Sequence, residues 1–163
     1  MNIQIRQAVP DDGPAVEAML LEAAQWVDAL GVRMWDESEL GSDLIAAEIR
    51  AGQFFVAECG GDPAGVIRFQ LEDRLFWPDI PQHESAFVHR LAVRRRYQGQ
   101  GVSTALLEWA VDRAQALGKR YLRLDCDEAR PKLRSLYEHF GFELHSFRHV
   151  GRHYVARYEY PLS

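Results

Sequence analysis

The stretch LAVRRRYQGQGVS, residues 91–103, joins an apolar run to a strongly helical pattern. It places two glycines, Gly99 and Gly101, directly before the helix. Glycine adopts positive φ angles without steric cost, which allows successive backbone N–H groups to point outward. The first N–H groups of a helix also lack partners, and the helix dipole is positive at that end. Because such a turn holds phosphate groups well, this stretch predicts an anion site between a strand and a helix.

Two better-known phosphate loops do not match this stretch. A nucleoside-triphosphate loop requires a lysine after its second glycine, and no lysine follows Gly101. A dinucleotide-binding fingerprint requires a third glycine where this chain has Thr104. An ordinary tight connection stays open for the glycines alone, but the adjoining Arg94, Arg95 and Arg96 concentrate positive charge there and favour the anion site.

The flanking segments predict the architecture. Periodicity and turn residues predict strands at 3–7, 53–59, 66–72, 85–93, 120–126, 143–150 and 153–160, and helices at 14–30, 42–50, 102–117 and 130–140. A turn at 60–65 joins two of these strands, and 71–85 is expected to be a loop. The strands on either side of the helix at 102–117 should be parallel. This order predicts a single-domain α/β fold with a mixed, mostly antiparallel sheet of about seven strands and four helices on its faces.

The composition limits the class of protein. The chain has 163 residues, 47% of them hydrophobic, which suits one domain over residues 1–163. A net charge of -5 argues against a nucleic-acid partner. Cys59 and Cys126 show no metal-ligand or disulfide spacing, so we expect reduced thiols and no metal. The N-terminal residues show neither a signal peptide nor a membrane span, which favours a cytoplasmic location and no membrane partner.

Two signatures resemble those of one family. Residues 96–101, RYQGQG, match the pattern [Q/R]xxGxG, and residues 133–142, LRSLYEHFGF, match (A/L)xxxYexxGF. In both features the chain resembles the GNAT superfamily of N-acetyltransferases. The resemblance covers residues 3–160 and is strongest over 86–142. It implies an enzyme that moves an acetyl group from acetyl-CoA, its co-substrate, to a primary amine of a small molecule, peptide or protein by direct attack with both substrates bound.

The resemblance also implies roles for particular residues. Backbone amides of the loop would hold the coenzyme A pyrophosphate, and these belong to Gln98, Gly99, Gln100, Gly101, Val102 and Ser103. Leu91 and Val93 would pair through their backbone with the pantetheine arm, and Arg96 would neutralise phosphate. Tyr137 would protonate the departing thiolate. Family members often carry asparagine seven residues before this tyrosine, where the chain has Arg130.

An amine acceptor requires a proton acceptor, because an alkylamine with a pKa near 10.4 is mostly protonated at neutral pH. His89 is the leading candidate, since it lies on the strand before the loop, on the same face as Leu91 and Val93, and its ordinary pKa suits base chemistry. Asp125, Glu84 and a water molecule are alternatives. The alternative stays open that His89 has only a structural role, either hydrogen-bonded in the core or interacting with Glu84 or Asp125.

The acceptor site is expected in the irregular segments that carry aromatic residues. Trp35 and Trp77 are candidate walls of a pocket, and Glu84 is a candidate partner for a cationic amine. The family resemblance also suggests a homodimer through the C-terminal strands.

Two other functions stay open. One is a non-catalytic acyl-CoA sensor, which would keep the phosphate loop but would not need the acid; the presence of Tyr137 favours the enzyme. The other is an acyltransferase that uses a hydroxyl acceptor or a longer acyl donor.

Overall fold

The computed structural model describes residues 2–29 and 41–163. Within these residues the strands are β1 (Ile3–Gln7), β2 (Phe54–Cys59), β3 (Asp62–Gln70), β4 (Ser85–Val93), β5 (Tyr121–Asp127), β6 (Glu143–Val150) and β7 (His153–Pro161). The α-helices are α1 (Gly13–Ala29), α2 (Ser42–Arg50), α3 (Val102–Ala116) and α4 (Pro131–Phe140). The strands form one seven-stranded sheet in the order β1-β2-β3-β4-β5-β7-β6. The predicted α/β fold is therefore confirmed.

The sheet is mostly antiparallel, as predicted. Strand β1 pairs with β2, β2 with β3, β5 with β7 and β6 with β7, each in antiparallel register. Strands β4 and β5 pair in parallel, which agrees with the expected crossover through a helix. Within the described ranges no helix has both the length and the apolar character needed to cross a membrane.

The chain divides into two compact units. The first contains Met1–Arg68 and Arg90–Leu107, and the second contains Phe69–His89 and Glu108–Ser163. Each is described by itself below. One domain over residues 1–163 stays a prediction.

In the first unit, α1 and α2 supply one wall of a hydrophobic core against β2 and β3. The buried side chains that form it are Val16, Met19, Leu20, Ile45, Ile49, Phe54, Val56 and Val66. Successive side chains of a strand point to opposite faces, so Gly65, next to Val66, lies on the other face. There it meets side chains of α3. Helices therefore cover both faces of β3.

The hairpin between β2 and β3 is tighter than predicted. Only Gly60 and Gly61 form the turn, and Cys59 pairs with Asp62 in the register. Both glycines have positive φ, 58° and 83°, as a two-residue hairpin with the favoured twist requires. The expected turn over 60–65 was wrong because its last four residues belong to β3. Strand β3 also ends at Gln70, earlier than predicted.

Helix α2 begins at the predicted residue, but Ser42, whose residue type favours the N-cap position, is the first residue of the helix and not its cap. Gly41 occupies the N-cap position, and no side chain caps the helix there. The Ser42 hydroxyl instead donates to Glu17 Oε2 at 2.8 Å. The predicted end of the helix at 14–30, just before Gly31, lies outside the described residues.

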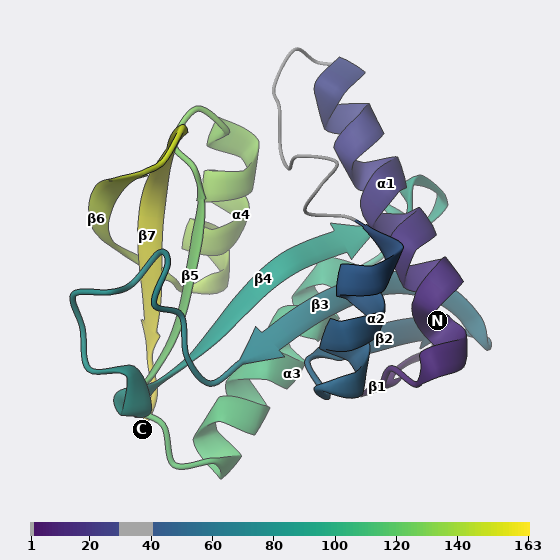
Figure 1. Ribbon diagram of the computed structural model, residues 1–163, viewed down its shortest axis with the longest axis horizontal. Coiled ribbons are helices and arrows are strands. Elements are labelled where there is room, and N and C mark those ends of the chain that lie inside the picture. The colour runs from purple at the N-terminus through teal and green to yellow at the C-terminus, as the bar shows by residue number, and fades with distance from the viewer. Residues whose placement is uncertain (1, 30–40) are drawn as a thin grey trace. The chain divides into compact units, whose positions relative to one another are not determined.

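In the second unit, strands β5, β7 and β6 lie side by side (Figure 1). Helix α4 packs on them through aromatic side chains. Tyr137 of α4 lies 6.3 Å from Tyr158 of β7, measured between ring centroids, and Phe140 lies 5.7 Å from Tyr160. The Arg134 Nε group donates to the Tyr158 hydroxyl at 3.0 Å. These contacts fix α4, and with it Tyr137, on the sheet.

Candidate active site

The predicted phosphate loop lies in the first unit between β4 and α3. A short 3-10 helix, η4 (Arg95–Tyr97), follows β4 and leads into the glycines. Gly99 has a φ of 74° and Gly101 a φ of 85°, both in the left-handed region that favours glycine. A Cβ at either position would meet no atom within 4 Å, so the backbone angle, rather than lack of space, requires glycine. These angles agree with the turn expected from the sequence.

The beginning of α3 presents backbone N–H groups next to this turn. The first hydrogen bond of the helix runs from the Ala105 N–H to the Gly101 carbonyl at 3.0 Å. The N–H groups of the preceding residues, 102–104, therefore have no partner within the helix. Residues 98–101 are exposed to solvent. The turn and the helix N-terminus thus form an accessible place for an anion.

Arg94 and Arg95 fix this loop to the rest of the first unit. The backbone N–H of Arg94 donates to the Ala64 carbonyl at 2.8 Å, and its Nε group donates to the Pro63 carbonyl at 2.9 Å. The backbone N–H of Arg95 donates to Glu22 Oε1 at 2.8 Å. Arg94 therefore has a structural role, and Glu22 ties α1 to the loop.

Arg96, the arginine expected to neutralise phosphate, is exposed and pairs with Asp62. The Tyr97 hydroxyl donates to the same carboxylate oxygen of Asp62 at 2.7 Å. The hydrogen bonds from Tyr97 and Arg96 lower the pKa of Asp62 below its usual range. Asp62 directly follows the hairpin turn, so this turn helps to set the position of Arg96.

Gly65 allows α3 to approach the sheet closely. A Cβ at this position would lie 2.9 Å from Val102 Cγ1 and 3.0 Å from the Ala92 carbonyl oxygen. The second of these contacts is with backbone, which cannot rotate away. The absence of a side chain at Gly65 therefore sets the distance between β3 and the first turn of α3.

The second unit brings His89 and Asp125 together through the strand register. Strands β4 and β5 pair at Ser85–Tyr121, Ala86–Leu122 and Phe87–Arg123. Two residues further along each strand, on the same face, His89 comes opposite Asp125. The distance from His89 Nδ1 to Asp125 Oδ2 is 3.8 Å. The contact between these two residues that the sequence left open is therefore present.

Asp73, which the sequence did not single out, holds the other side of the imidazole. His89 Nε2 lies 2.8 Å from Asp73 Oδ2. Asp73 Oδ1 accepts the backbone N–H groups of Leu75 and Phe76 at 3.2 and 3.0 Å. Burial alone would raise the pKa of Asp73, but the hydrogen bonds from His89 and the two N–H groups lower it. Asp73 is therefore a carboxylate that accepts a hydrogen bond from the Nε2–H group of His89.

Asp125 has a different environment from Asp73. Its side chain is only 9% exposed, and Oδ2 has no hydrogen-bond partner among the described residues. Burial raises the pKa of Asp125 to about 6, although the charge of His89 opposes this shift. Donor atoms of Asp73, His89 and Asp125 all lie within 4.8 Å of one another. The 2.8 Å separation at Nε2 is that of a hydrogen bond, so a shared proton accounts for it without an ion.

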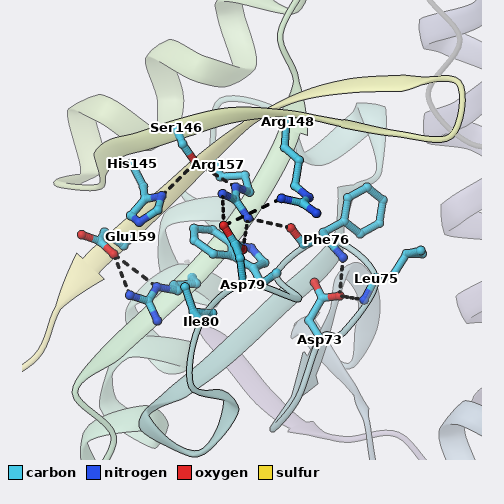
Figure 2. A network of polar contacts seen from close by, with 12 residues as sticks. Asp73, Leu75, Phe76, Asp79, Ile80, His145, Ser146, Arg148, Arg157 and Glu159 are labelled. Carbon is cyan, nitrogen blue, oxygen red and sulfur yellow. Dashed lines mark hydrogen bonds and ion pairs between the residues drawn. The ribbon is translucent and has the colours of Figure 1, made fainter.

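The loop at 71–84 is fixed by Arg157 (Figure 2). The Arg157 guanidinium makes two hydrogen bonds to Asp79, at 2.7 and 3.0 Å, and donates to the Phe76 carbonyl at 3.0 Å. Its Nε group donates to Ser146 Oγ at 2.8 Å. The hydrogen bonds from Arg157 lower the pKa of Asp79 to about 2. The loop that carries Asp73 is therefore held by specific side-chain contacts, although its sequence is irregular.

Trp77 belongs to this loop, and its ring lies close to two guanidinium groups. Arg157 lies 4.5 Å and Arg123 5.2 Å from its ring centroid. Trp77 is completely buried, so in this structure it offers no surface to an acceptor. The expectation of a pocket wall is therefore not supported at Trp77. Trp35, the other predicted wall, lies outside the described residues.

Glu84 lies beside arginines. Its Oε1 is 3.8 Å from Arg123 Nη1, and its Oε2 is 3.9 Å from Arg120 Nη1. These partners account for the carboxylate of Glu84 without an acceptor amine. Its suggested role in substrate binding stays a prediction.

Tyr137 is buried beside Phe142, with 5.8 Å between ring centroids. Burial raises the pKa of the Tyr137 phenol well above its usual range, so the group is protonated at neutral pH. Cys126 is also buried, and burial raises the pKa of its thiol to about 12, which makes it a poor nucleophile. Both side chains therefore hold their protons at neutral pH.

Arg90 interrupts the predicted alternation along β4. Its φ of 55° is the one positive value at a non-glycine position in the described chain. The prediction that His89 shares a face with Leu91 and Val93 assumed an unbroken extended strand. Because the backbone turns at Arg90, the alternation does not carry across it.

Comparison with known proteins identifies the family to which the chain belongs. Residues 18–142 match the model of the acetyltransferase (GNAT) family. The uncharacterised N-acetyltransferase YesJ of Bacillus subtilis (strain 168) is 32% identical over 142 residues, which are 83% of this chain and 79% of that protein.

Solved structures show the same fold. A GNAT-family acetyltransferase from Listeria monocytogenes 4b F2365 has a TM-score of 0.80 at 22% identity, covering 98% of this chain and 95% of that one. The PaiA N-acetyltransferase of Thermoplasma acidophilum, in complex with coenzyme A, has a TM-score of 0.78 at 18% identity, covering 98% and 100%. With its glycine turn before α3, its buried Tyr137 and this family match, the chain belongs to the GNAT acetyltransferase family and is an acyltransferase.

Proposed function

We propose that this enzyme transfers the acetyl group of acetyl-CoA to a primary amine of a small molecule or a peptide. Both substrates bind together, and the amine attacks the thioester directly. The observation that carries the proposal is the accessible turn of Gly99 and Gly101, both with positive φ, immediately before α3. The coenzyme A bound by the PaiA relative supports the choice of donor.

The residues of the loop fit the phosphates of the donor. The N–H groups at the beginning of α3 would hold the pyrophosphate, and Arg96 would exchange Asp62 for a phosphate oxygen. Acetyl-CoA supplies an activated thioester carbonyl when bound. The backbone of Leu91 and Val93 would position the pantetheine arm.

Tyr137 would act as the acid of the reaction. Its buried phenol keeps its proton at neutral pH and can donate it to the departing thiolate. Because burial removes competing water, this proton stays available until the thiolate forms. The presence of Tyr137 at this position supports the enzyme over a non-catalytic sensor.

The donor is tested by thermal unfolding of the purified protein with and without acetyl-CoA. We expect acetyl-CoA to raise Tm, and Gly101→Val to abolish that increase, because valine disfavours a φ of 85°. Gly151→Val is the matched control, since Gly151 also has a positive φ, 59°, and a Cβ there meets nothing within 4 Å. Both substitutions strain the backbone, but only the one at Gly101 should remove the response to acetyl-CoA.

The reaction is tested by release of free thiol from acetyl-CoA with a panel of amines and alcohols. Turnover with amines supports the proposal. An unchanged Tm with acetyl-CoA would refute the choice of donor. A raised Tm without turnover would indicate a sensor, and turnover with alcohols alone would indicate a hydroxyl acceptor.

A further inference from the structure

Three ionisable side chains of the second unit form a connected cluster around one imidazole. Asp73 comes from the loop after β3, His89 from β4 and Asp125 from β5. His89 Nε2 is 2.8 Å from Asp73 Oδ2, and His89 Nδ1 is 3.8 Å from Asp125 Oδ2. Each ring nitrogen of His89 therefore faces a carboxyl group, Nε2 that of Asp73 and Nδ1 that of Asp125. The two carboxyl groups differ in their hydrogen bonds.

Asp73 determines where the imidazole carries its proton. Both oxygens of Asp73 accept hydrogen bonds, Oδ1 from the N–H groups of Leu75 and Phe76 and Oδ2 from His89. A carboxylate can only accept, so the proton of the neutral ring lies on Nε2. Nδ1 is then the basic nitrogen, and it faces Asp125.

Asp125 Oδ2 is the atom of the cluster that the structure leaves unsatisfied. It is buried and has no hydrogen-bond partner among the described residues. A buried carboxylate oxygen without a partner is unfavourable, and such an atom in a folded protein calls for an explanation. An oxygen that must accept a proton from a substrate cannot be occupied by a permanent donor.

We propose that Asp125, His89 and Asp73 are the proton relay that deprotonates the amine acceptor, with Asp73 as the positioning residue. Because Asp125 Oδ2 is buried, it takes the proton of the substrate ammonium through one water. It passes a proton to His89 Nδ1, and the ring becomes an imidazolium between two carboxylates. One N–H bond of the ammonium breaks, one N–H bond forms on the ring, and the ring later releases this proton to water. The relay rests on the proposed amine acetylation.

The remaining proton count also balances. The amine loses a second N–H proton as the C–N bond forms, and Tyr137 gives one proton to the thiolate. The second amine proton goes through solvent to the Tyr137 oxygen, so Tyr137 regains the proton that it gave. The gap of 3.8 Å between Nδ1 and Oδ2 closes to a hydrogen bond with a movement of about 1 Å, or is bridged by one water. No metal or oxidant is needed.

The charges around Asp125 suit proton exchange near neutral pH. Burial and the charge of Asp73 raise its pKa, whereas His89 and Arg157 lower it, with a net value of about 6. The neighbouring thiol of Cys126 and the phenol of Tyr137 are both protonated at neutral pH. Asp125 is therefore ionised and ready to accept a proton above about pH 6, and the relay predicts that kcat/KM falls below that pH.

The test compares Asp73→Asn with Glu72→Gln, using two amines. The asparagine side chain keeps an oxygen for the Leu75 and Phe76 N–H groups, but its amide donates to Nε2 and so moves the ring proton to Nδ1. Glu72 is 68% exposed and pairs only loosely with Arg74, at 3.7 Å, so its change removes the same charge one residue away. Both variants are first compared with the wild type by thermal unfolding and by the Tm increase with acetyl-CoA.

We expect Asp73→Asn to lower kcat about a hundredfold with an alkylamine, which is protonated at neutral pH. With an amine of pKa roughly 5, which needs no base, the loss should be less than about threefold. Glu72→Gln should change neither rate by more than about twofold. Asp125→Asn should show the same dependence on amine pKa as Asp73→Asn.

The tautomer of His89 is measured separately by two-bond ¹H–¹⁵N correlation spectra. The proton is expected on Nε2 in the wild type and on Nδ1 in Asp73→Asn. Three results would each overturn the relay. One is an equal loss of kcat with both amines in Asp73→Asn, and another is a proton on Nδ1 in the wild type. The third is loss of wild-type activity when a chelator removes metal ions such as Zn²⁺, which the cluster of Asp73, His89 and Asp125 could bind. Wild-type protein that acetylates no amine would overturn the proposed function together with the relay, whereas the other outcomes refute the relay alone.

Discussion

Asp125 is a buried carboxyl group whose ionisation opposes folding. Its pKa is about 6 in the folded protein, compared with an ordinary value of 3.8. The folded state therefore binds the proton more tightly than the unfolded state. Ionisation of Asp125 lowers the free energy of unfolding fully above about pH 6, and this effect disappears below the unfolded pKa.

Asp125→Asn is accordingly expected to stabilise the protein at about pH 8, by on the order of 1–3 kcal/mol, and to have little effect near pH 3.5. The measurement is urea-induced unfolding at both pH values. Asp127→Asn, on the same strand, is the control, because the new side-chain amide still offers an oxygen to the Ala129 N–H. A gain of equal size at both pH values would contradict the pKa assigned to Asp125. Asp125→Asn is thus expected to raise the free energy of unfolding at about pH 8 and to lower kcat with an alkylamine.

Tyr137 tests the assignment of the acid. We expect Tyr137→Phe to lower kcat about a hundredfold, because only the hydroxyl that protonates the thiolate is removed. The Tm increase with acetyl-CoA should stay within error of the wild type, since the ring still packs on Phe142. Tyr160→Phe, another aromatic position against Phe142, controls for the loss of a hydroxyl and should leave kcat unchanged. An unaltered rate in Tyr137→Phe would remove it as the acid.

At the scale of elements, the position of α3 depends on a contact with β3 that is distant in sequence. Gly65→Ala places a methyl group 2.9 Å from Val102 Cγ1 and 3.0 Å from a backbone oxygen, so the first turn of α3 must move. We expect a loss of about 1–3 kcal/mol in the free energy of unfolding and a smaller Tm increase with acetyl-CoA. Urea unfolding and thermal unfolding measure the two effects.

Gly13→Ala is the matched control for this substitution. A Cβ at Gly13 meets nothing within 4 Å, and Gly13 lies in α1 with ordinary helical angles. Alanine there should be neutral or slightly stabilising. If Gly65→Ala and Gly13→Ala lower the free energy of unfolding by similar amounts, the close approach of α3 is not the reason that position 65 requires glycine.

The sequence predicted these elements well because their signals are local. Glycines and periodic apolar residues mark the ends and faces of α3 and β4, so residues 91–103 alone were enough to predict a glycine turn between this strand and this helix. The partners of the site could not be predicted in this way. Asp73 meets His89 across 16 residues and Arg157 meets Asp79 across 78, in a segment with no periodicity. Asp73 has one sequence signal, a carboxylate two and three residues before N–H groups that it caps, but this pattern is common in turns.

At the scale of the whole molecule, the reactivity of the two cysteine thiols can follow the unfolding of the two units separately. Cys59 lies in the first unit and Cys126 in the second, and both are buried. If residues 1–163 are one cooperative domain, the two thiols should become reactive together as denaturant is added. Pulsed alkylation followed by mass spectrometry of the peptides measures each thiol separately. Modification of one thiol at a clearly lower urea concentration than the other would show that the units unfold independently.

Arg157 contacts several residues at once, so a substitution at position 157 affects all of them. Its planar guanidinium donates hydrogen bonds to Asp79, the Phe76 carbonyl and Ser146, and it also stacks on Trp77. Lysine has one point charge and cannot make these contacts at once. A related protein that lacks this arginine would leave Asp79 with only the more distant Arg148, at 3.8 Å, and would remove one of the two guanidinium groups that contact Trp77. Related sequences are therefore expected to exchange positions 79 and 157 in concert, and that covariation would trace how each lineage reshaped the loop beside its active site.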